Sequence, residues 1–323
     1  MKNYLILLTF SVAVQISIYA QDHPLVLDKQ GTFKILSRTD YARNDKFTPA
    51  EMVANLEQLK KLADVVRKNP ILAGLQGFNA QMRLDDISSV VKCNYGVPVN
   101  VEFEFCAFFK NKKGEVVFNS IEPPEWELQI NSMNGIGINS NGFDQNKCYF
   151  TVPFNKKTIA PGIDMYDNIC YVLYDPSRPD YWIPVTVNEA FACARELAAK
   201  ETDEFTAKLN KQFLDKEWAE IPAADRDKPA YFGGNLSKVR STSSYEGQEN
   251  IFQPIMTVNP KYWNTNRPKS DIQFMVFHIR DKKELKQIAD DYLKHQSTSY
   301  PCILFEQAMD IDFVKSLTSL IIQ

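Results

Sequence analysis

The stretch that decides the fold reads Val99-Asn100-Val101-Glu102-Phe103-Glu104-Phe105. Apolar and polar residues alternate along it without a break, which is typical of a β-strand with one buried face and one face in water. The alternation ends at Cys106, and the apolar residues after it make both faces apolar. We therefore expect an antiparallel strand over 99–109 whose far end is covered on both sides.

Further strand-like runs follow between the first two predicted helices. Residues 111–114 (Asn-Lys-Lys-Gly) are typical of a hairpin turn that leads into a short strand at 115–118. Runs with the composition of further strands follow at 126–130, 147–152, 169–174 and 181–185.

Capping residues mark the helix starts. Thr48 and Thr186 are each followed three residues later by Glu, which is the pattern of a capping box. The first predicted helix ends before Pro70. The second is expected to run as one helix to about Trp218, with apolar residues at helical spacing that include Phe205, Leu209 and Phe213. Asp281 starts a third helix, and residues 311–321 form a fourth.

The predicted fold class is α+β, with an antiparallel strand-rich region packed by helices. Strands over 271–280 and 300–305, each followed by a helix, predict a C-terminal β-α-β-α element. The predicted organisation is a signal peptide over 1–20, an α+β domain over 21–220, a long loop or linker over 221–250, and the β-α-β-α element over 251–323. That last element either stands apart or belongs to the same domain.

The first 20 residues have the layout of a cleaved signal peptide. Lys2 gives a positive end, residues 4–14 form an apolar run, and Ala20 is a small residue before a cleavage point. We therefore expect an exported protein in a periplasm or outside the cell. No later apolar run is long enough to cross a membrane.

The charge balance argues against nucleic acid as a partner. The chain has a net charge of −3, and removal of Lys2 with the signal peptide changes it to −4. Phosphate binding needs grouped Lys and Arg residues, which the sequence offers only in short clusters.

Six cysteines in an oxidising compartment permit disulfides. The best candidate pair is Cys148 with Cys170, because each opens a strand-like run and the two runs can be neighbours. Cys193 lies among apolar residues of a predicted helix, which favours a buried thiol there.

A search for reaction chemistry finds no catalytic, metal or cofactor motif. The chain has three histidines and lacks H-E-x-x-H, G-x-S-x-G, the phosphate-binding loop and G-x-G-x-x-G. A pair of carboxylates is the remaining route to catalysis, because the separation that glycoside hydrolysis needs does not show in a sequence.

Aromatic residues in loop-like segments are the remaining lead. Tyr231 and Phe232 lie within the long 221–250 segment, and Tyr262 and Trp263 lie in a segment flanked by prolines. They either dock these segments onto the protein body or form a binding platform. The predicted function is therefore a non-catalytic binding protein for an envelope component or a partner protein. The alternative is a secreted hydrolase of glycans or peptides that uses a carboxylate pair.

Two short segments carry a resemblance. Residues 181–186 (Tyr-Trp-Ile-Pro-Val-Thr) lead into a helix, and residues 258–263 (Val-Asn-Pro-Lys-Tyr-Trp) follow later. The chain resembles uncharacterised secreted bacterial proteins that pair a Pro-Val-Thr segment before a helix with a later Asn-Pro-x-Tyr segment. The resemblance implies a bacterial envelope or secreted setting and supplies no catalytic residue.

Overall fold

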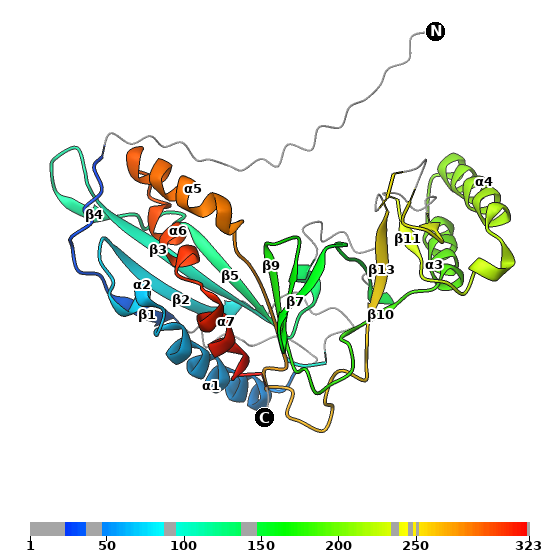
Figure 1. Cartoon of the computed structure of the whole chain (residues 1–323), viewed down its shortest axis with the longest axis horizontal. Coiled ribbons are helices and arrows are strands. Elements are labelled where there is room, and N and C mark those ends of the chain that lie inside the picture. Colours follow the sequence, from blue (N-terminus) through cyan, green and yellow to red (C-terminus); the bar gives the residue numbers. More distant parts are fainter. Residues whose placement is uncertain are drawn as a thin grey trace, which may run out of the picture.

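A computed structural model shows an α+β fold, as predicted. It describes residues 23–36, 47–86, 95–136, 147–233, 239–244, 248–249 and 252–321. The predicted signal peptide over 1–20 lies outside these residues. Figure 1 shows an elongated molecule, with a large sheet and most helices at one end and a helical pair at the other.

Among the described residues, nine strands form the large sheet. Its order is β1-β2-β3-β5-β14-β9-β8-β7, with β4 paired to β3, and every neighbouring pair is antiparallel except β1 and β2. The strands are β1 (Phe33–Leu36), β2 (Phe78–Asp86), β3 (Val99–Lys110), β4 (Val116–Phe118), β5 (Glu125–Ile130), β7 (Lys156–Ala160), β8 (Ile163–Tyr166), β9 (Cys170–Tyr174) and β14 (Phe274–His278).

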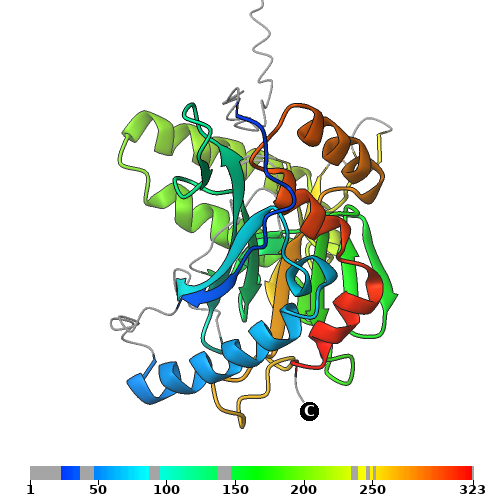
Figure 2. The same cartoon turned by 90° about the vertical axis from the view of Figure 1, so that its left-hand side faces the viewer.

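Five helices pack against one face of this sheet, as Figure 2 shows from that end of the molecule. The alternating residues of β3 decide which face they cover, because Phe103 and Phe105 are buried there against Phe305 and Trp126. The helices are α1 (Pro49–Val66), α2 (Pro70–Ala73), α5 (Lys282–Lys294), α6 (Tyr300–Gln307) and α7 (Ile311–Thr318).

A second sheet of five strands has the order β10-β13-β11-β12, with β6 paired to β13. Its strands are β6 (Tyr149–Thr151), β10 (Trp182–Pro184), β11 (Tyr231–Phe232), β12 (Val239–Arg240) and β13 (Gln253–Val258). Helices α3 (Val187–Ala199) and α4 (Glu204–Glu220) lie beside it, and two short 3-10 turns, η1 (Asn134–Ile136) and η3 (Ala223–Asp225), complete the described elements.

The structure confirms the predicted helix starts. Thr48 and Thr186 both form capping boxes with the Glu three residues later, and Asp281 caps α5. The strand predicted over 300–305 is wrong, because this segment is helix α6 with Pro301 in its first turn. A short apolar run fits a buried helix as well as a buried strand, and here α6 places Phe305 against β3.

The prediction of one long helix from Thr186 to about Trp218 is also wrong. The chain leaves the helix at Lys200 and starts α4 at Asp203, whose side chain accepts a hydrogen bond from the backbone N–H of Thr206 at 2.8 Å. The Glu201 side chain accepts hydrogen bonds from the two backbone N–H groups that follow it. These local bonds replace the helical ones and turn the chain, so that α3 and α4 form a pair.

The C-terminal strands are shared between the two sheets. β13 pairs with β10 and β6 in the second sheet, whereas β14 pairs with β5 and β9 in the large sheet. The late strands β13 and β14 therefore pair with strands from earlier in the chain, β13 in the second sheet and β14 in the large sheet. Within the predicted 221–250 loop, β11 and β12 pair with each other and β11 also pairs with β13.

Candidate interaction surface

The C-terminal half of α4 is anchored to the protein body. Leu214 is buried, and the ring of Trp218 meets Phe191 of α3 edge to face at a centroid distance of 5.1 Å. The guanidinium groups of Arg195 and Arg226 lie over the Trp218 ring, at 5.0 and 4.1 Å from its centroid. Such cation–π contacts add about 0.5–1 kcal/mol each at partly exposed sites.

Ion pairs reinforce this anchor. Arg240 of β12 lies 3.1 Å from Glu217, and Arg195 of α3 lies 3.5 Å from Asp215. Arg226 also donates through Nη2 to the backbone carbonyl of Trp218 at 3.4 Å. The contacts that fix α4 are therefore concentrated between residues 214 and 218.

The outward side of α4 carries an exposed apolar stripe. Phe205, Leu209 and Phe213 are 74%, 37% and 46% exposed, and their spacing of four residues places them on one face of the helix. Leu214, which anchors α4, points to the body instead. We call these three residues the α4 stripe. Isolated exposed apolar residues are ordinary, whereas three on one helix face make the α4 stripe a candidate interaction surface.

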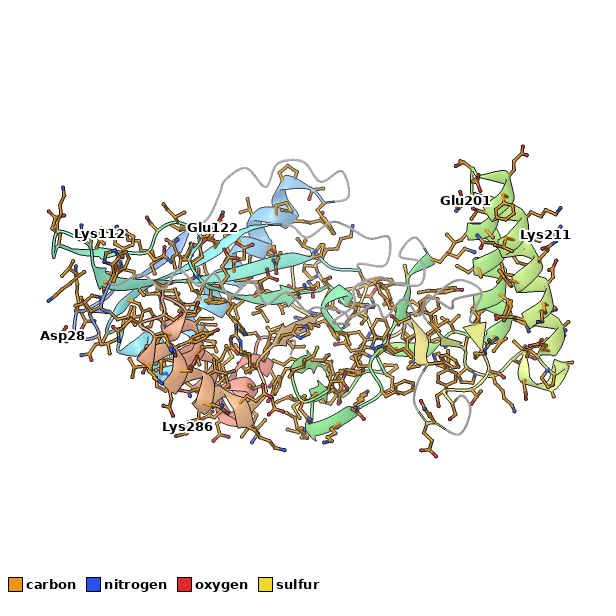
Figure 3. All side chains as sticks on the ribbon, turned by 90° about the horizontal axis from the view of Figure 1, so that it is seen from above. Asp28, Lys112, Glu122, Glu201, Lys211 and Lys286 are labelled. Carbon is orange, nitrogen blue, oxygen red and sulfur yellow. The ribbon has the colours of Figure 1, made fainter. Side chains whose placement is uncertain are left out.

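A groove of about 520 Å³ lies between α3 and α4, which together form a helical hairpin. Small or apolar side chains make up half of its lining, and charged side chains make up the rest. The apolar ones are Ala198, Ala199, Ala207 and Leu214, and the charged ones are Arg195, Lys208, Lys211 and Asp215. This hairpin lies at one tip of the molecule, where Figure 3 labels Glu201 and Lys211.

The four aromatic residues that the sequence singled out do not form one platform. Tyr231 and Phe232 are half-buried in β11, where the Tyr231 ring stacks on Phe154 at a centroid distance of 6.4 Å. Tyr262 and Trp263 are 1% and 3% exposed and belong to a separate buried cluster. A platform of exposed rings cannot include these last two residues.

Tyr262 is held by polar contacts as well as by packing. Its Oη donates to the backbone carbonyl of Gln273 at 2.6 Å and accepts from the backbone N–H of Asp175 at 3.2 Å. Burial raises the pKa of this hydroxyl, so it stays protonated and keeps donating. Tyr262 therefore docks the segment 259–273 onto the body.

The candidate disulfide between Cys148 and Cys170 is not present in the structure. Cys170 is a free thiol at the start of β9 in the large sheet, and its Sγ donates to the carbonyl of Gly135 at 3.7 Å. Burial raises the pKa of Cys170. Cys148 immediately precedes β6 of the second sheet, so the two strand-like runs that suggest the pair belong to different sheets and do not pair with each other.

Three carboxylates gather on the polar face of the large sheet. Oxygens of Glu102 and Glu104 of β3 and of Glu125 of β5 lie within 4.8 Å of one another. Arg83 of β2 lies 2.8 Å from Glu104 and 3.7 Å from Glu102, and Gln81 donates to Glu104. Within the described residues these acids have the spacing of cation ligands, but the Arg83 guanidinium already neutralises part of their charge.

Glu104 and Glu125 lie in different surroundings. Burial, and then repulsion from Glu104 and Glu127, raises the pKa of Glu125. Glu104 is 5% exposed and bonded to Arg83 and Gln81, whereas Glu125 is exposed. A carboxylate held by arginine beside one with a raised pKa is the arrangement that acid–base hydrolysis uses.

The sequence spacing of Phe205, Leu209 and Phe213 predicts an inward face of one long helix, whereas the structure exposes these residues on α4. Thr202-Asp203 before Glu204 is a helix-start signal that would have separated α4 from α3.

Comparison of the chain with protein-family models, with curated proteins and with solved structures finds no match. Within the described ranges, no helix combines the length and the apolar character that crossing a membrane requires.

Proposed function

We propose that this chain is an exported, non-catalytic binding protein whose partner is a protein that docks on α4. The observation that carries the proposal is the α4 stripe, which exposes two phenylalanines and a leucine on a helix that is anchored at its other half. Amphipathic helices that bind in a partner's groove use anchors at this spacing. The occupant that fits is a protein with an apolar groove that receives Phe205, Leu209 and Phe213.

The dimensions of the stripe favour a protein over a membrane surface. It extends over eight helical steps, or about 12 Å at 1.5 Å per residue. The charges of α4 do not favour anionic lipid, because its three lysines are outnumbered by four acids: Glu204, Asp215, Glu217 and Glu220. The predicted export signal places this partner in the cell envelope or outside the cell.

The energy available from the stripe is adequate for specific binding. Full burial of a Phe or Leu side chain contributes roughly 1.5–3 kcal/mol. Interfaces commonly depend on a few such anchors near their centre, while surrounding charged residues contribute little.

The test is photo-crosslinking from a residue beside the stripe, in envelope extract. A photoreactive residue at Gln212 is expected to crosslink one protein, and Phe205→Ser with Phe213→Ser is expected to abolish that product. The matched control is Phe118→Ser with Ile121→Ser, which removes exposed apolar side chains at the opposite end of the molecule (48% and 82% exposed). Equal loss in both double variants, or binding only to anionic lipid vesicles, would contradict the proposal.

A second candidate function has its own observation, the acids Glu104 and Glu125 on the sheet face. Retaining glycosidases hold two carboxyl groups about 5–5.5 Å apart, with one ionised and one of raised pKa. A secreted hydrolase of glycans or peptides would turn over a substrate panel and lose activity in Glu104→Gln and in Glu125→Gln. Glu122→Gln, at an exposed turn position that does not shift the pKa of Glu125, is the matched control.

A further inference from the structure

A polar cavity of about 210 Å³ lies at the junction of the two sheets. Its lining comes from the two connections between them, since residues 175–181 link β9 to β10 and residues 259–273 link β13 to β14. Figure 1 shows both connections at the lower middle of the molecule. Ligand sites occur preferentially where two structural units meet. This cavity is separate from the α4 stripe, so the two can be tested independently.

The lining groups are held in place by hydrogen bonds between the two connections and within the second one. Arg178 donates through Nε to the carbonyl of Tyr262 at 2.8 Å and through Nη2 to the carbonyl of Lys261 at 3.4 Å. The Gln273 side chain accepts from the backbone N–H of Asn264 at 2.8 Å and donates to its carbonyl at 3.4 Å. These bonds fix the cavity before any ligand arrives, which lowers the cost of binding.

Both signs of charge line this small space. Arg178 and Arg267 contribute guanidinium groups, and Asp175 contributes a carboxylate. One oxygen of Asp175 already accepts from the backbone N–H and the hydroxyl of Ser177, at 2.9 and 2.7 Å. These two hydrogen bonds from Ser177 orient the Asp175 carboxylate. Arg267 is oriented in the same way by Asp271, 2.8 Å from its Nε.

We propose that this cavity binds a small zwitterion of the amino-acid class. The ligand's carboxylate is received by the guanidinium groups of Arg178 and Arg267, which suit planar carboxylates. Its ammonium group is received by Asp175. A simple anion would meet the Asp175 carboxylate, and a simple cation would meet two arginines, so neither is matched to the whole site. The volume corresponds to about seven water molecules at roughly 30 Å³ each, which is room for a small amino acid.

The first test is calorimetric titration of the purified protein with glycine, L-alanine, acetate and methylammonium. The zwitterions are expected to bind saturably, and each half-ligand at least about tenfold more weakly, because each half-ligand lacks one of the two charge-assisted contacts. Acetate binding as tightly as glycine would reduce the cavity to an anion site and overturn the proposal. So would the absence of saturable binding by either amino acid.

Variants then assign the two ends of the ligand. Asp175→Asn is expected to weaken glycine binding about tenfold without weakening acetate, and the amide oxygen can still accept from Ser177. Arg267→Gln is expected to weaken the binding of both glycine and acetate. Asp180→Asn is the matched control for the first variant, because Asp180 ends the same exposed turn without lining the cavity. Thermal unfolding shows that each variant is folded, and equal losses in Asp175→Asn and Asp180→Asn would contradict the assignment.

Discussion

Tyr181 donates a hydrogen bond from Oη to Oδ2 of Asp164 at 2.7 Å, and both side chains are buried, at 1% and 0% exposure. Asp164 also accepts from the Thr158 hydroxyl at 2.6 Å and lies 2.9 Å from the Lys156 ammonium group. Asp164 belongs to β8 of the large sheet, whereas Tyr181 immediately precedes β10 of the second sheet. This pair is therefore a polar link between the two sheets.

Tyr181→Phe is predicted to lower the free energy of unfolding by about 1–3 kcal/mol, because it removes a donor from a buried carboxylate. Burial raises the pKa of Tyr181 well above its usual value, so the native hydroxyl donates throughout the neutral range. Urea unfolding measures the loss. Tyr174→Phe is the matched control and should cost less, because Tyr174 donates to Asp164 over 3.3 Å. Equal losses would show that ring packing rather than the hydrogen bond decides the effect.

Asn131 binds three backbone groups of two chain segments from a fully buried position. Its Nδ2 donates to the carbonyls of Val97 and Asp271 at 3.2 and 2.9 Å, and its Oδ1 accepts from the N–H of Gln273 at 2.8 Å. Its φ of 52° lies in the left-handed region, which Asn tolerates better than most residues. Asn131→Ala is predicted to cost roughly 3 kcal/mol or more, because buried backbone groups lose their partners.

Chemical denaturation of Asn131→Ala measures this cost. Asn266→Ala provides the control, because Asn266 is exposed in the connection between β13 and β14. A loss below about 1 kcal/mol, the ordinary effect of a point mutation, would contradict the role given to Asn131.

The Cys302 thiol is predicted to resist alkylation in the folded protein. Burial, and then the nearby Glu306 carboxylate, raises the pKa of Cys302 to about 12, and the residue is 2% exposed. The thiolate that reacts with iodoacetamide is therefore scarce at pH 8. Mass spectrometry should find Cys302 unlabelled in native protein and labelled in urea. Labelling at equal rates in both states would show that the α6 region opens readily.

Glu125 is predicted to make stability fall as the pH rises. Its folded pKa is raised above the ordinary value of 4.5, so the folded state binds more protons than the unfolded state in that window. The stabilisation is complete below pH 4.5 and is lost as the pH rises through the raised folded pKa. Glu125→Gln should flatten this part of the profile, whereas Glu122→Gln at an exposed turn position should not. Urea midpoints from pH 4 to 7 measure the difference.

Local signals predicted the elements that local chemistry controls. The capping boxes at Thr48 and Thr186 each form, and the alternation from Val99 to Phe105 sets the buried face of β3. The sequence does not predict the edge strand β7 or its neighbour β8, because Lys156–Ala160 is mostly polar and gains its strand geometry by pairing with β8. Pairing of this kind is a tertiary effect that propensity does not capture.

The candidate sites depended still more on tertiary structure. The sequence leaves open whether Tyr262 and Trp263 dock their segment or form a binding platform. Packing against Tyr95, Tyr181 and Phe274 buries them. The carboxylates of Glu104 and Glu125 are 21 positions apart in sequence and come together only through the register of β3 and β5. No sequence spacing reports such a register.

The two faces of α4 are predicted to respond oppositely to mutation. Leu214→Ala should lower stability by about 2–4 kcal/mol, because Leu214 is 1% exposed and anchors α4 against α3. Phe205→Ser should change stability by less than about 0.5 kcal/mol, because this ring is 74% exposed. Thermal and urea unfolding of both variants measure the contrast. A large loss for Phe205→Ser would mean that the ring supports the fold, and the α4 stripe could then no longer be interpreted as a surface kept for a partner.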